Sequence, residues 1–381
     1  MAWYKHSFAV FLTLTSNYVD ASSFQKRDWY PTVQSYQILG DVSDPSLNRD
    51  SCGSSKVGDR LLWTCRDTQN RNGDTLNGPV YSSSAAWTNL NSDGTPQLGM
   101  YSTHSSTPYF PYASDECPQS SSGDCGDGTR FALWQNQPPL VTSVNGNVAT
   151  AYTWIPRTHI SGLTPVHGEE DPATNLYKIV YDTTNPDRNA MPVATLFREQ
   201  FWWGNTIPFG SYGTLVKDGY AYLFGQPSNK HICLAKVPTS QVEDIGAYQY
   251  WVNGAWTKDF PLLSQSASCN IPNASAGGQG TYYFSDYWNK YVWIGQGAWS
   301  VSSRFLVTTA DSITGPWAEP VFFYQGQDGS YNLGAYTLQA HPGMSADNQG
   351  KLSKNEIYIT YTKSDTDQQL YSTPLIHIKW N

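Results

Sequence analysis

Apolar residues recur along the chain in short runs that are separated by glycine, asparagine, aspartate and proline. Five of these runs combine β-branched and aromatic residues, a composition typical of β-strands. They are Arg60–Cys65 (RLLWTC), Ala151–Ile155 (AYTWI), Tyr220–Phe224 (YAYLF), Tyr291–Ile294 (YVWI) and Ile357–Tyr361 (IYITY). No convincing segment shows the 3.6-residue period of an amphipathic helix. The pattern predicts an all-β fold.

These five strands begin 91, 69, 71 and 66 residues apart. Similar units at such spacing predict a five-bladed β-propeller in which each blade is a small antiparallel sheet. The first interval is longer because residues 108–128 form a Ser/Gly-rich insertion, which Cys117 and Cys125 can close. The units exceed a usual blade in length, so long loops are expected to gather at one face and build the site. A β-sandwich of jelly-roll topology is the alternative fold, which five similar units disfavour.

The clearest single blade is the segment from Tyr282 to Tyr324. Its expected strands are Tyr282–Ser285, Tyr291–Gly295, Phe305–Ala310 and Pro320–Tyr324. Before the last of them lies the turn DSITGPW, in which Gly315 tolerates unusual φ values and Pro316 fixes its own. Trp317, at the end of this turn, is expected to pack between two blades.

The segment Arg49–Gln69 (RDSCGSSKVGDRLLWTCRDTQ) holds two aspartates and two cysteines at matching positions. In an antiparallel hairpin, residues that face each other share a constant index sum, which is 117 for Cys52 with Cys65 and for Asp50 with Asp67. Residues two apart share a face, so all four side chains would project to one side. Opposed Cβ atoms lie roughly 4.5–5.5 Å apart, where like charges are destabilising. A stable fold has little reason to place two carboxylates there, whereas glycoside hydrolysis requires such a pair.

A purely structural interpretation of this hairpin is two polar strand-end residues that the twist separates, or a different register. Arg49 and Arg66 flank the aspartates but alternate to the other face of an ideal strand, so we expect them to form structural ion pairs. One of two neighbouring carboxyl groups should have a raised pKa and serve as the acid. A carboxyl separation of about 5–5.5 Å would favour retention and roughly 6.5–9.5 Å inversion. The acidic segment 169–171, after His167, is expected to be a solvated turn.

Composition supports a large, aromatic-rich β domain. The 381 residues include 15 Trp, 26 Tyr, 31 Gly and 23 Pro, and only 14% of them are charged. The formal net charge of −8 and the lack of a basic run argue against nucleic acid and anionic membranes as partners. We expect residues 28–381 to form a single propeller domain and the protein to be a monomer.

Residues 1–27 are typical of a signal peptide followed by a pro-segment. Lys5 and His6 precede an apolar stretch, Phe8 to Leu14, and small residues follow it. The pair Lys26-Arg27 has the form of a dibasic processing site of the kind used on fungal secreted proteins, with an ordinary exposed pair as the alternative. No other segment is long and apolar enough to span a bilayer. The sequence therefore predicts a secreted, extracellular protein.

All six cysteines follow the leader, which fits an oxidising compartment. Six cysteines allow fifteen connectivities, and the sequence spacing favours Cys52–Cys65, Cys117–Cys125 and Cys233–Cys269. No CxxC occurs, and the seven histidines do not fall at ligand spacing near the cysteines, so we expect neither a metal site nor a cofactor. Asn273-Ala274-Ser275 is a glycosylation acceptor, typical of a surface loop in a secreted protein.

Several of these residues together resemble a known family. The matching pieces are Asp50, Leu62-Trp63, Asp67-Thr68, Asp218–Gly225 (DGYAYLFG), Gly315-Pro316-Trp317 and His341-Pro342. They are similar to the five-bladed propeller family once called domain of unknown function 4185, which includes endo-D-arabinanases of glycoside hydrolase family 183. The resemblance extends from about Ser35 to Trp380 and implies cleavage of α-D-arabinofuranosyl linkages, with Asp50 and Asp67 in the catalytic positions. The chain departs from the family at Cys65-Arg66, where Phe-Gly is usual.

Other residues are candidates for substrate contact. Glu199, Trp202 and Trp203 lie in REQFWWGNT (198–206), where the indole rings would either stack on sugar rings or pack between sheets. Tyr212, in PFGSYG (208–213), is expected to enter a central strand and line the funnel. His341 lies where the fifth blade enters the centre, and the family match implies substrate contact, with a core histidine as the alternative.

The sequence therefore predicts a secreted propeller that hydrolyses arabinofuranosyl linkages in an extracellular polysaccharide, with Asp50 and Asp67 as the essential pair. A second hypothesis is an arabinanase or xylosidase that resembles glycoside hydrolase family 43 and uses Glu199 as a separate general acid. A third, from another class, is a non-catalytic carbohydrate-binding propeller, which would tolerate Asp50→Asn. No GxSxG elbow and no phosphate-binding glycine loop is present. Fold alone does not decide among these hypotheses, because propellers host many functions.

Overall fold

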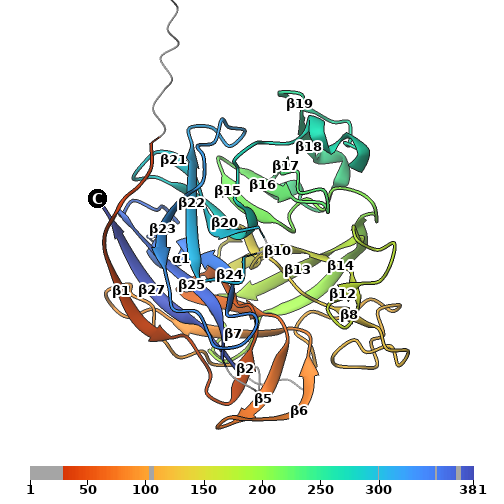
Figure 1. Cartoon of the computed structure of the whole chain (residues 1–381), viewed down its shortest axis with the longest axis vertical. Coiled ribbons are helices and arrows are strands. Elements are labelled where there is room, and N and C mark those ends of the chain that lie inside the picture. Colours follow the sequence, from red (N-terminus) through yellow and green to blue (C-terminus); the bar gives the residue numbers. More distant parts are fainter. Residues whose placement is uncertain (1–28, 103–106, 299, 348–349, 366–369) are drawn as a thin grey trace, which may run out of the picture.

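Antiparallel sheets are arranged in a ring around a common centre (Figure 1). This computed structural model describes residues 29–102, 107–298, 300–347, 350–365 and 370–381. The ribbon colours follow the ring, from orange at the bottom through green to dark blue at the left. Within the described residues five sheets form the blades and two smaller sheets accompany them. The predicted leader, residues 1–27, lies outside the described part of the chain.

Each blade begins with its innermost strand and proceeds outward. Blade 1 contains β3 (Gly53–Val57), β4 (Arg60–Cys65) and β7 (Ser84–Asn89). Blade 2 contains β9 (Leu140–Asn145), β10 (Val148–Pro156), β13 (Thr174–Asp182) and β14 (Val193–Trp202). Blade 3 contains β15 (Gly213–Lys217), β16 (Tyr220–Gly225), β17 (Cys233–Pro238), β18 (Gln249–Val252) and β19 (Ala255–Thr257). Blade 4 contains β20 (Gly277–Ser285), β21 (Lys290–Gly297), β22 (Arg304–Ala310) and β23 (Val321–Gln325).

Blade 5 combines the two ends of the described chain. It contains β24 (Ala335–Ala340), β25 (Glu356–Asp365), β27 (Pro374–Trp380) and, outermost, β1 (Val33–Asp41), while β26 (Leu370–Ser372) pairs with β25. Strand β1 runs antiparallel to β27, with Val33 opposite Trp380 and Asp41 opposite Pro374. The last blade is therefore completed by the first strand.

The two smaller sheets and the helices are short. One sheet contains β2 (Leu47–Arg49), β5 (Thr68–Asn72) and β6 (Thr75–Tyr81), and the other β8 (Arg130–Ala132), β11 (Thr158–Ser161) and β12 (Thr164–Pro165). The helices are α1 (Pro342–Ser345) and the 3-10 turns Thr239–Gln241, Ile245–Ala247 and Leu263–Ser268. Among the described residues, no helix has the length and apolarity to cross a membrane, and no group of three or more His, Cys, Asp or Glu could hold a metal ion.

The innermost strands contact one another in the order β3, β9, β15, β20 and β24. The step from β24 back to β3 is made by side chains. Ser51 Oγ lies 2.8 Å from Thr337 Oγ1, and Ser54 Oγ lies 2.8 Å from His341 Nδ1. The ring is thus closed, and the predicted five-bladed β-propeller is confirmed.

The five strands predicted from sequence are the second strands of the five blades, namely β4, β10, β16, β21 and β25. A second strand has a neighbour on each edge and an adjacent blade on each face, so both faces favour apolar residues. All six residues of β4 are buried, including both cationic Arg60 and apolar Trp63. This double burial explains why these strands dominate the hydrophobic pattern.

The hydrophobic core lies between neighbouring blades. Buried clusters join blades 1 and 2, 2 and 3, 3 and 4, 4 and 5, and 5 and 1. Trp317 belongs to the cluster between blades 3 and 4, where its ring lies 5.8 Å from that of Tyr282. The predicted packing of this turn residue between blades is therefore confirmed.

The three predicted disulfides are present: Cys52–Cys65, Cys117–Cys125 and Cys233–Cys269. The second closes the insertion that lengthens the first unit. The third joins β17 to the segment after the 3-10 turn Leu263–Ser268. Asn273 is exposed, as its predicted glycosylation requires, and the modification itself stays a prediction.

Candidate active site

The hairpin that carries the two aspartates has the predicted register. Gly53 pairs with Thr64 across β3 and β4, and Arg49 pairs with Thr68 across β2 and β5. Each pair has the index sum 117. The Cα atoms of Cys52 and Cys65 lie 4.1 Å apart, and their disulfide joins the two sides. Asp50 and Asp67 therefore lie opposite each other in the junction between the strand pair β2–β5 and the strand pair β3–β4.

The ladder is irregular at this point. Asp50 N donates to Asp67 O at 2.9 Å, but Asp50 O accepts from Arg66 N at 2.8 Å. Ser51 has a φ of 50°, in the left-handed region. Two residues, Arg66 and Asp67, thus lie opposite Asp50, which is the arrangement of a β-bulge. A bulge re-aims side chains, and here it breaks the alternation that the sequence analysis assumed for Arg66.

Asp50 is half-buried and accepts two hydrogen bonds. Its Oδ1 accepts from Ser51 Oγ and from Tyr336 Oη, each at 2.7 Å. Burial raises the pKa of Asp50 above its usual value, and the charge of Asp67 adds to this effect. The Arg66 charge and the two hydrogen bonds act in the opposite direction but do not cancel it. Asp50 is therefore suited to hold a proton.

Asp67 has different surroundings. Its Oδ1 accepts from Arg130 Nη2 at 2.7 Å and from Trp134 Nε1 at 3.1 Å. Both donors stabilise a carboxylate anion, and the bond from the guanidinium is charge-assisted. The Asp67 side chain keeps 23% exposure, so a substrate can reach it. The pair consists of two carboxyl groups with unlike environments.

Arg66 lies close enough to both aspartates for its charge to act on them. Among the described residues, its side chain makes no hydrogen bond to either carboxyl group. Its Nε donates to Gln135 O at 3.1 Å and its Nη2 to Asn136 Oδ1 at 2.5 Å. Burial lowers the pKa of Arg66, while the charge of Asp50 raises it. The expectation of a structural ion pair on the other face was wrong for Arg66, because of the bulge. Arg49 does turn away, but it donates to Met100 Sδ and Ser102 Oγ instead of a carboxylate.

The segment 135–137 lies at the propeller axis. Asn136 O accepts from Gln279 Nε2 at 2.9 Å and from Gln339 Nε2 at 3.0 Å, which come from blades 4 and 5. Gln137 Nε2 donates to Tyr212 O at 2.9 Å and to Gly280 O at 2.8 Å, in blades 3 and 4. This polar segment holds the blades together and orients Arg66 beside the carboxyl pair.

Three further predicted site residues lie at or next to the outer strand β14. Glu199 is exposed on this outermost strand of blade 2, so it does not reach the axis. Trp202 is 2% exposed and donates from Nε1 to Phe209 O at 2.7 Å, which makes it a core residue. Trp203 directly follows β14 and is 71% exposed. The structure thus separates these residues from Asp50 and Asp67.

Tyr212 and His341 are buried between blades. The Tyr212 hydroxyl contacts Ser275 Oγ at 2.8 Å and Gly278 O at 2.5 Å, so its ring does not line the funnel. His341 is fully buried, with Nδ1 bonded to Ser54 Oγ and Nε2 2.6 Å from Thr360 Oγ1. Burial lowers the pKa of His341 to about 3, so the ring is neutral. Direct substrate contact by either side chain is corrected to a packing role.

Sequence reasoning assigned Arg66 to the wrong face and missed three residues that contact the pair: Arg130, Trp134 and Tyr336. Tyr336 is the second residue of β24, the innermost strand of blade 5. That strand precedes the recognised run Ile357–Tyr361, so its first residues were identifiable as axial. Arg130 and Trp134 come from the long connection between blades 1 and 2, whose path no local pattern reveals.

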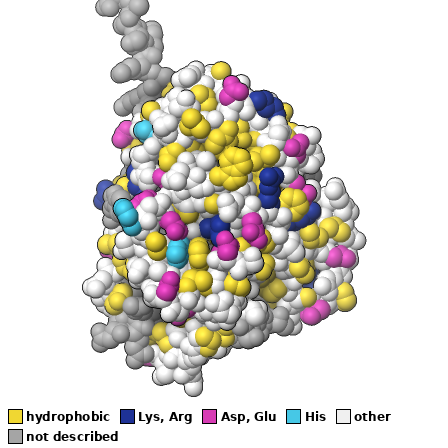
Figure 2. Space-filling view, turned by 90° about the vertical axis from the view of Figure 1, so that its right-hand side faces the viewer, with side chains coloured by type: hydrophobic (Ala, Val, Ile, Leu, Met, Phe, Trp, Pro, Cys, Tyr) yellow, Lys and Arg dark blue, Asp and Glu magenta, His cyan; other side chains and the backbone are white. Residues whose placement is uncertain are grey.

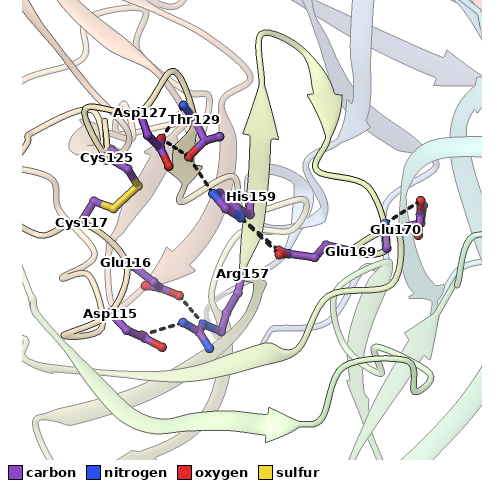
Figure 3. A network of polar contacts seen from close by, with 12 residues as sticks. Asp115, Glu116, Cys117, Cys125, Asp127, Thr129, Arg157, His159, Glu169 and Glu170 are labelled. Atoms are coloured by element: carbon purple, nitrogen blue, oxygen red, sulfur yellow. Dashed lines mark hydrogen bonds and ion pairs between the residues drawn. A yellow bond between two sulfur atoms is a disulfide. The ribbon is translucent and has the colours of Figure 1, made fainter.

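A second polar network lies next to the Cys117–Cys125 disulfide (Figure 3). Arg157 donates to Glu116 Oε1 at 2.8 Å and to Asp115 Oδ1 at 2.6 Å. His159 joins Thr129 Oγ1, 2.9 Å from Nε2, to Glu169 Oε2, 3.2 Å from Nδ1. The segment 169–171 is therefore tied to strand β11 and is not only a solvated turn.

No protein-family model matches the chain, and no curated protein matches it. Solved structures do resemble it. A putative hydrolase from Bacteroides ovatus superposes with a TM-score of 0.58 at 14% identity, over 90% of this chain and 87% of that one. An exo-β-1,3-galactanase from Phanerochaete chrysosporium gives a TM-score of 0.49 at 12% identity, over 90% of this chain and 64% of the other. An exo-1,5-α-L-arabinanase from a bovine ruminal metagenomic library gives 0.40 at 9% identity, over 88% and 94%.

At 14% identity, the likeness to the Bacteroides ovatus protein supports a common fold. Function has to be argued from the site, because propellers host many chemistries. The similarity to endo-D-arabinanases in the sequence motifs stays a prediction.

Proposed function

We propose that this protein is a secreted glycoside hydrolase that cuts arabinofuranosyl linkages, with Asp50 and Asp67 as its catalytic pair. The observation that carries the proposal is the contrast between the two carboxyl groups. Burial raises the pKa of Asp50, whereas Asp67 accepts hydrogen bonds from a guanidinium and an indole. Glycosidases need such a pair, one group protonated and the other ionised.

In this mechanism Asp50 is the general acid. Its proton passes to the glycosidic oxygen as the bond to the anomeric carbon breaks. The Arg66 charge and the Tyr336 hydroxyl stabilise the Asp50 carboxylate that results. These two groups keep the pKa of Asp50 from rising so far that the proton would not leave.

Asp67 supplies the negative charge on the other side of the reaction. Its carboxylate either attacks the anomeric carbon or removes a proton from the attacking water. In both cases water adds across the bond, so that one fragment gains hydrogen and the other hydroxyl. Arg130 and Trp134 hold Asp67 Oδ1 in place during these steps.

The arabinofuranosyl substrate class rests on the family resemblance of Asp50, Leu62-Trp63 and Asp67-Thr68. The extracellular location rests on residues 1–27 and is supported by three disulfides, which persist in oxidising compartments. We expect processing at Lys26-Arg27, a sugar on Asn273 and a monomer.

The hypothesis of a separate glutamic acid finds no support in the position of Glu199, which lies on the outermost strand of blade 2. The segments at and just before the starts of the inner strands of blades 2, 3 and 4 carry amide, hydroxyl and aromatic side chains and no carboxylate. Examples are Asn136, Tyr212 and Gln279. A carbohydrate-binding propeller without catalysis does not require the contrast between Asp50 and Asp67.

The test is reducing-end release from D-arabinan, L-arabinan and xylan by the mature protein, with Asp50→Asn and Asp67→Asn beside it. Release from one polymer that both variants abolish, while both still unfold cooperatively on heating, supports the hydrolase and its pair. Binding to a polymer without release by the wild type would instead identify a binding protein. Variants as active as the wild type would remove the carboxylate argument.

A further inference from the structure

A groove of 220 Å³ crosses the boundary between blades 2 and 3. One wall comes from the connection between β10 and β13, with His159 and residues 169–171, and the other from blade 3, with Ser211 and Gln226. Asn136 lines the groove at the axis. Figure 2 shows the side of the molecule on which β8, β12 and β14 lie, where acidic, basic and histidine side chains gather in a band below a hydrophobic patch.

Two contacts connect this groove to the candidate catalytic pair. Asn136 Oδ1 accepts from Arg66 Nη2, and the charge of Arg66 acts on both aspartates. Strand β8 supplies the second contact: Arg130 bonds Asp67, and the next residue, Phe131, stacks on His159 with ring centroids 4.2 Å apart. The groove and the pair are therefore linked through Arg66 and through strand β8.

The walls of the groove are rich in proline and are bonded to each other. Five prolines line it: Pro156, Pro165, Pro172, Pro208 and Pro227. Asp171 fastens the walls together, since its two carboxylate oxygens accept from Ser228 N at 2.7 Å and Ser228 Oγ at 2.6 Å. A rigid site loses little conformational entropy when a ligand binds. Proline rings with a few placed polar groups also suit sugars, whose C–H faces are apolar and whose edges carry hydroxyls.

An exposed tryptophan lies in a turn that is attached to one wall of the groove. Trp203 is 71% exposed, while its neighbour Trp202 is buried. The turn that carries Trp203 is anchored to the groove, because Asn205 N donates to Asp171 O at 2.7 Å. Tryptophan is a large, rigid side chain that is enriched where binding energy concentrates. An indole in this position offers a flat surface for a sugar ring.

We infer that the groove from Asn136 to Trp203 binds a linear, neutral polysaccharide chain and holds sugar residues distant from the cleaved bond. The inference rests on the proposed function, since it extends the same site. A long substrate then gains affinity from contacts at Trp203 that a short one cannot reach. The enzyme therefore prefers long chains to short glycosides.

The charges of the groove determine which polymers fit. Glu169 and Glu170 are exposed on one wall, with side-chain exposures of 44% and 56%, and Lys230 lies on the other. Acidic side chains repel anionic ligands, and such repulsion contributes to specificity. Chains of uronic acids are accordingly poor ligands, while uncharged chains are accepted.

The test compares the mature wild type with Trp203→Ala and with Tyr287→Ala. Tyr287 is a matched control, because it is an aromatic side chain of 56% exposure on blade 4. Each protein is assayed on linear arabinan and on a short aryl arabinofuranoside. We expect Trp203→Ala to lower the ratio of the two kcat/KM values about ten-fold, mainly through KM for arabinan. Tyr287→Ala is expected to keep the ratio of the wild type.

The outcomes separate the groove from the chemistry. A wild type that hydrolyses arabinan, with an unchanged ratio in Trp203→Ala, overturns the groove and leaves the proposed function in place. A wild type that hydrolyses nothing contradicts the proposed function. In that case, the binding of arabinan shows whether the groove holds a polysaccharide. In gels that contain arabinan, retardation of the wild type and Tyr287→Ala but not of Trp203→Ala supports it, and equal migration of all three overturns it.

A separate experiment tests the effect of the groove's charges. Gels that contain polygalacturonate, an anionic polymer, are expected to leave the wild type unretarded. A double substitution, Glu169→Gln with Glu170→Gln, is expected to increase retardation in these gels. Stronger retardation of the wild type by polygalacturonate than by arabinan would overturn the assignment to neutral chains.

Discussion

Glu116 and Asp50 make an informative comparison, because each lies just before a disulfide-bonded cysteine and close to an arginine. Glu116 is fully buried, and both of its oxygens are engaged: Oε1 accepts from Arg157 at 2.8 Å and Asn175 at 3.0 Å, and Oε2 accepts from Ala113 N at 2.8 Å (Figure 3). Arg66 gives its hydrogen bonds to the segment 135–136 and reaches Asp50 only through its charge.

The difference contrasts an acid that an ion pair fixes in place with the acid to which we assign proton transfer. A buried charge is tolerated when it is paired and hydrogen-bonded, as at Glu116. Near Asp50, Arg66 donates its hydrogen bonds to Gln135 and Asn136 instead of to the carboxyl group. Burial therefore outweighs the attraction between the Arg66 charge and Asp50, and the pKa of Asp50 rises. The same residue types can therefore lock a loop or hold a proton, according to where the arginine donates.

The largest expected effect is the loss of catalysis when either aspartate is replaced. Asp67→Asn and Asp50→Asn are each expected to lower the rate of reducing-end release by roughly 10²–10⁴-fold, because each removes one partner of the acid and base chemistry. Asp50→Asn should not lower the melting temperature, and Asp67→Asn should lower it only slightly, because its ion pair with Arg130 is partly exposed. If either variant keeps the wild-type rate on an accepted polymer, its carboxylate is not part of the reaction.

Glu116→Gln should instead affect stability. The change removes the negative charge opposite Arg157, whose side chain is 11% exposed, and leaves a buried cation poorly compensated. We expect the free energy of unfolding to fall by about 3 kcal/mol, as measured by denaturant titration, with the rate of the folded enzyme unchanged.

Asp115→Asn is the matched control for Glu116→Gln. Asp115 also bonds Arg157, but its side chain is 61% exposed. Its loss should cost less than about 1 kcal/mol. An equal cost for both substitutions would mean that burial does not distinguish the two acids.

A smaller effect is expected for Tyr336→Phe, which sharpens the assignment of Asp50. The hydroxyl donates to Asp50 at 2.7 Å and lowers its pKa, so removal raises that pKa further. Since the reaction needs Asp50 protonated, the pH at which the rate declines on the alkaline side should move upward. The maximal rate should fall about ten-fold, because the leaving proton is held more tightly. A pH–rate profile beside Tyr287→Phe measures both, and a downward shift would contradict the role of Asp50.

The smallest effect concerns stability and pH. Because the folded-state pKa of Asp50 is raised, its favourable contribution is present in acid and lost as pH rises through that pKa. Above the ordinary aspartate pKa, the folded protein must either keep a proton that the unfolded chain releases or bury the Asp50 charge, and both cost stability. Asp50→Asn should therefore melt above the wild type at neutral pH. The gap should close toward pH values near the ordinary aspartate pKa of about 3.9. A lower melting temperature for Asp50→Asn at neutral pH would show that its charge is needed for folding.

Much of the fold could be predicted because its second strands are buried on both faces. Arg60–Cys65 and the four similar runs carry this double burial in their own residues. The constant index sum also identified Cys52–Cys65 and the meeting of Asp50 with Asp67, because a tight hairpin has little freedom of register.

The remainder of the site depends on contacts that no local pattern encodes. The bulge at Arg66 and Asp67 re-aims the Arg66 side chain. Ser51, opposite it, is left-handed without being glycine, which is hard to foresee from sequence. Tyr336 reaches Asp50 only because the ring closes. Trp202 and Trp203 are identical neighbours in the sequence, yet one is buried and the other 71% exposed, because the strand ends between them.

The pairing of β1 with β27 has a consequence for how the chain is made. Residues 33–41 leave the ribosome early, but their partner strand, residues 374–380, is synthesised more than three hundred residues later. Until β27 is made, it cannot pair with β25, and β1 cannot join the blade because it pairs only with β27. The edge of β25 is then open to other chains. In a secretory pathway, a chaperone bound to the growing chain would protect this edge from pairing with other chains. A stop codon just before Pro374 should therefore cause aggregation and degradation even though every residue of the candidate site has been translated.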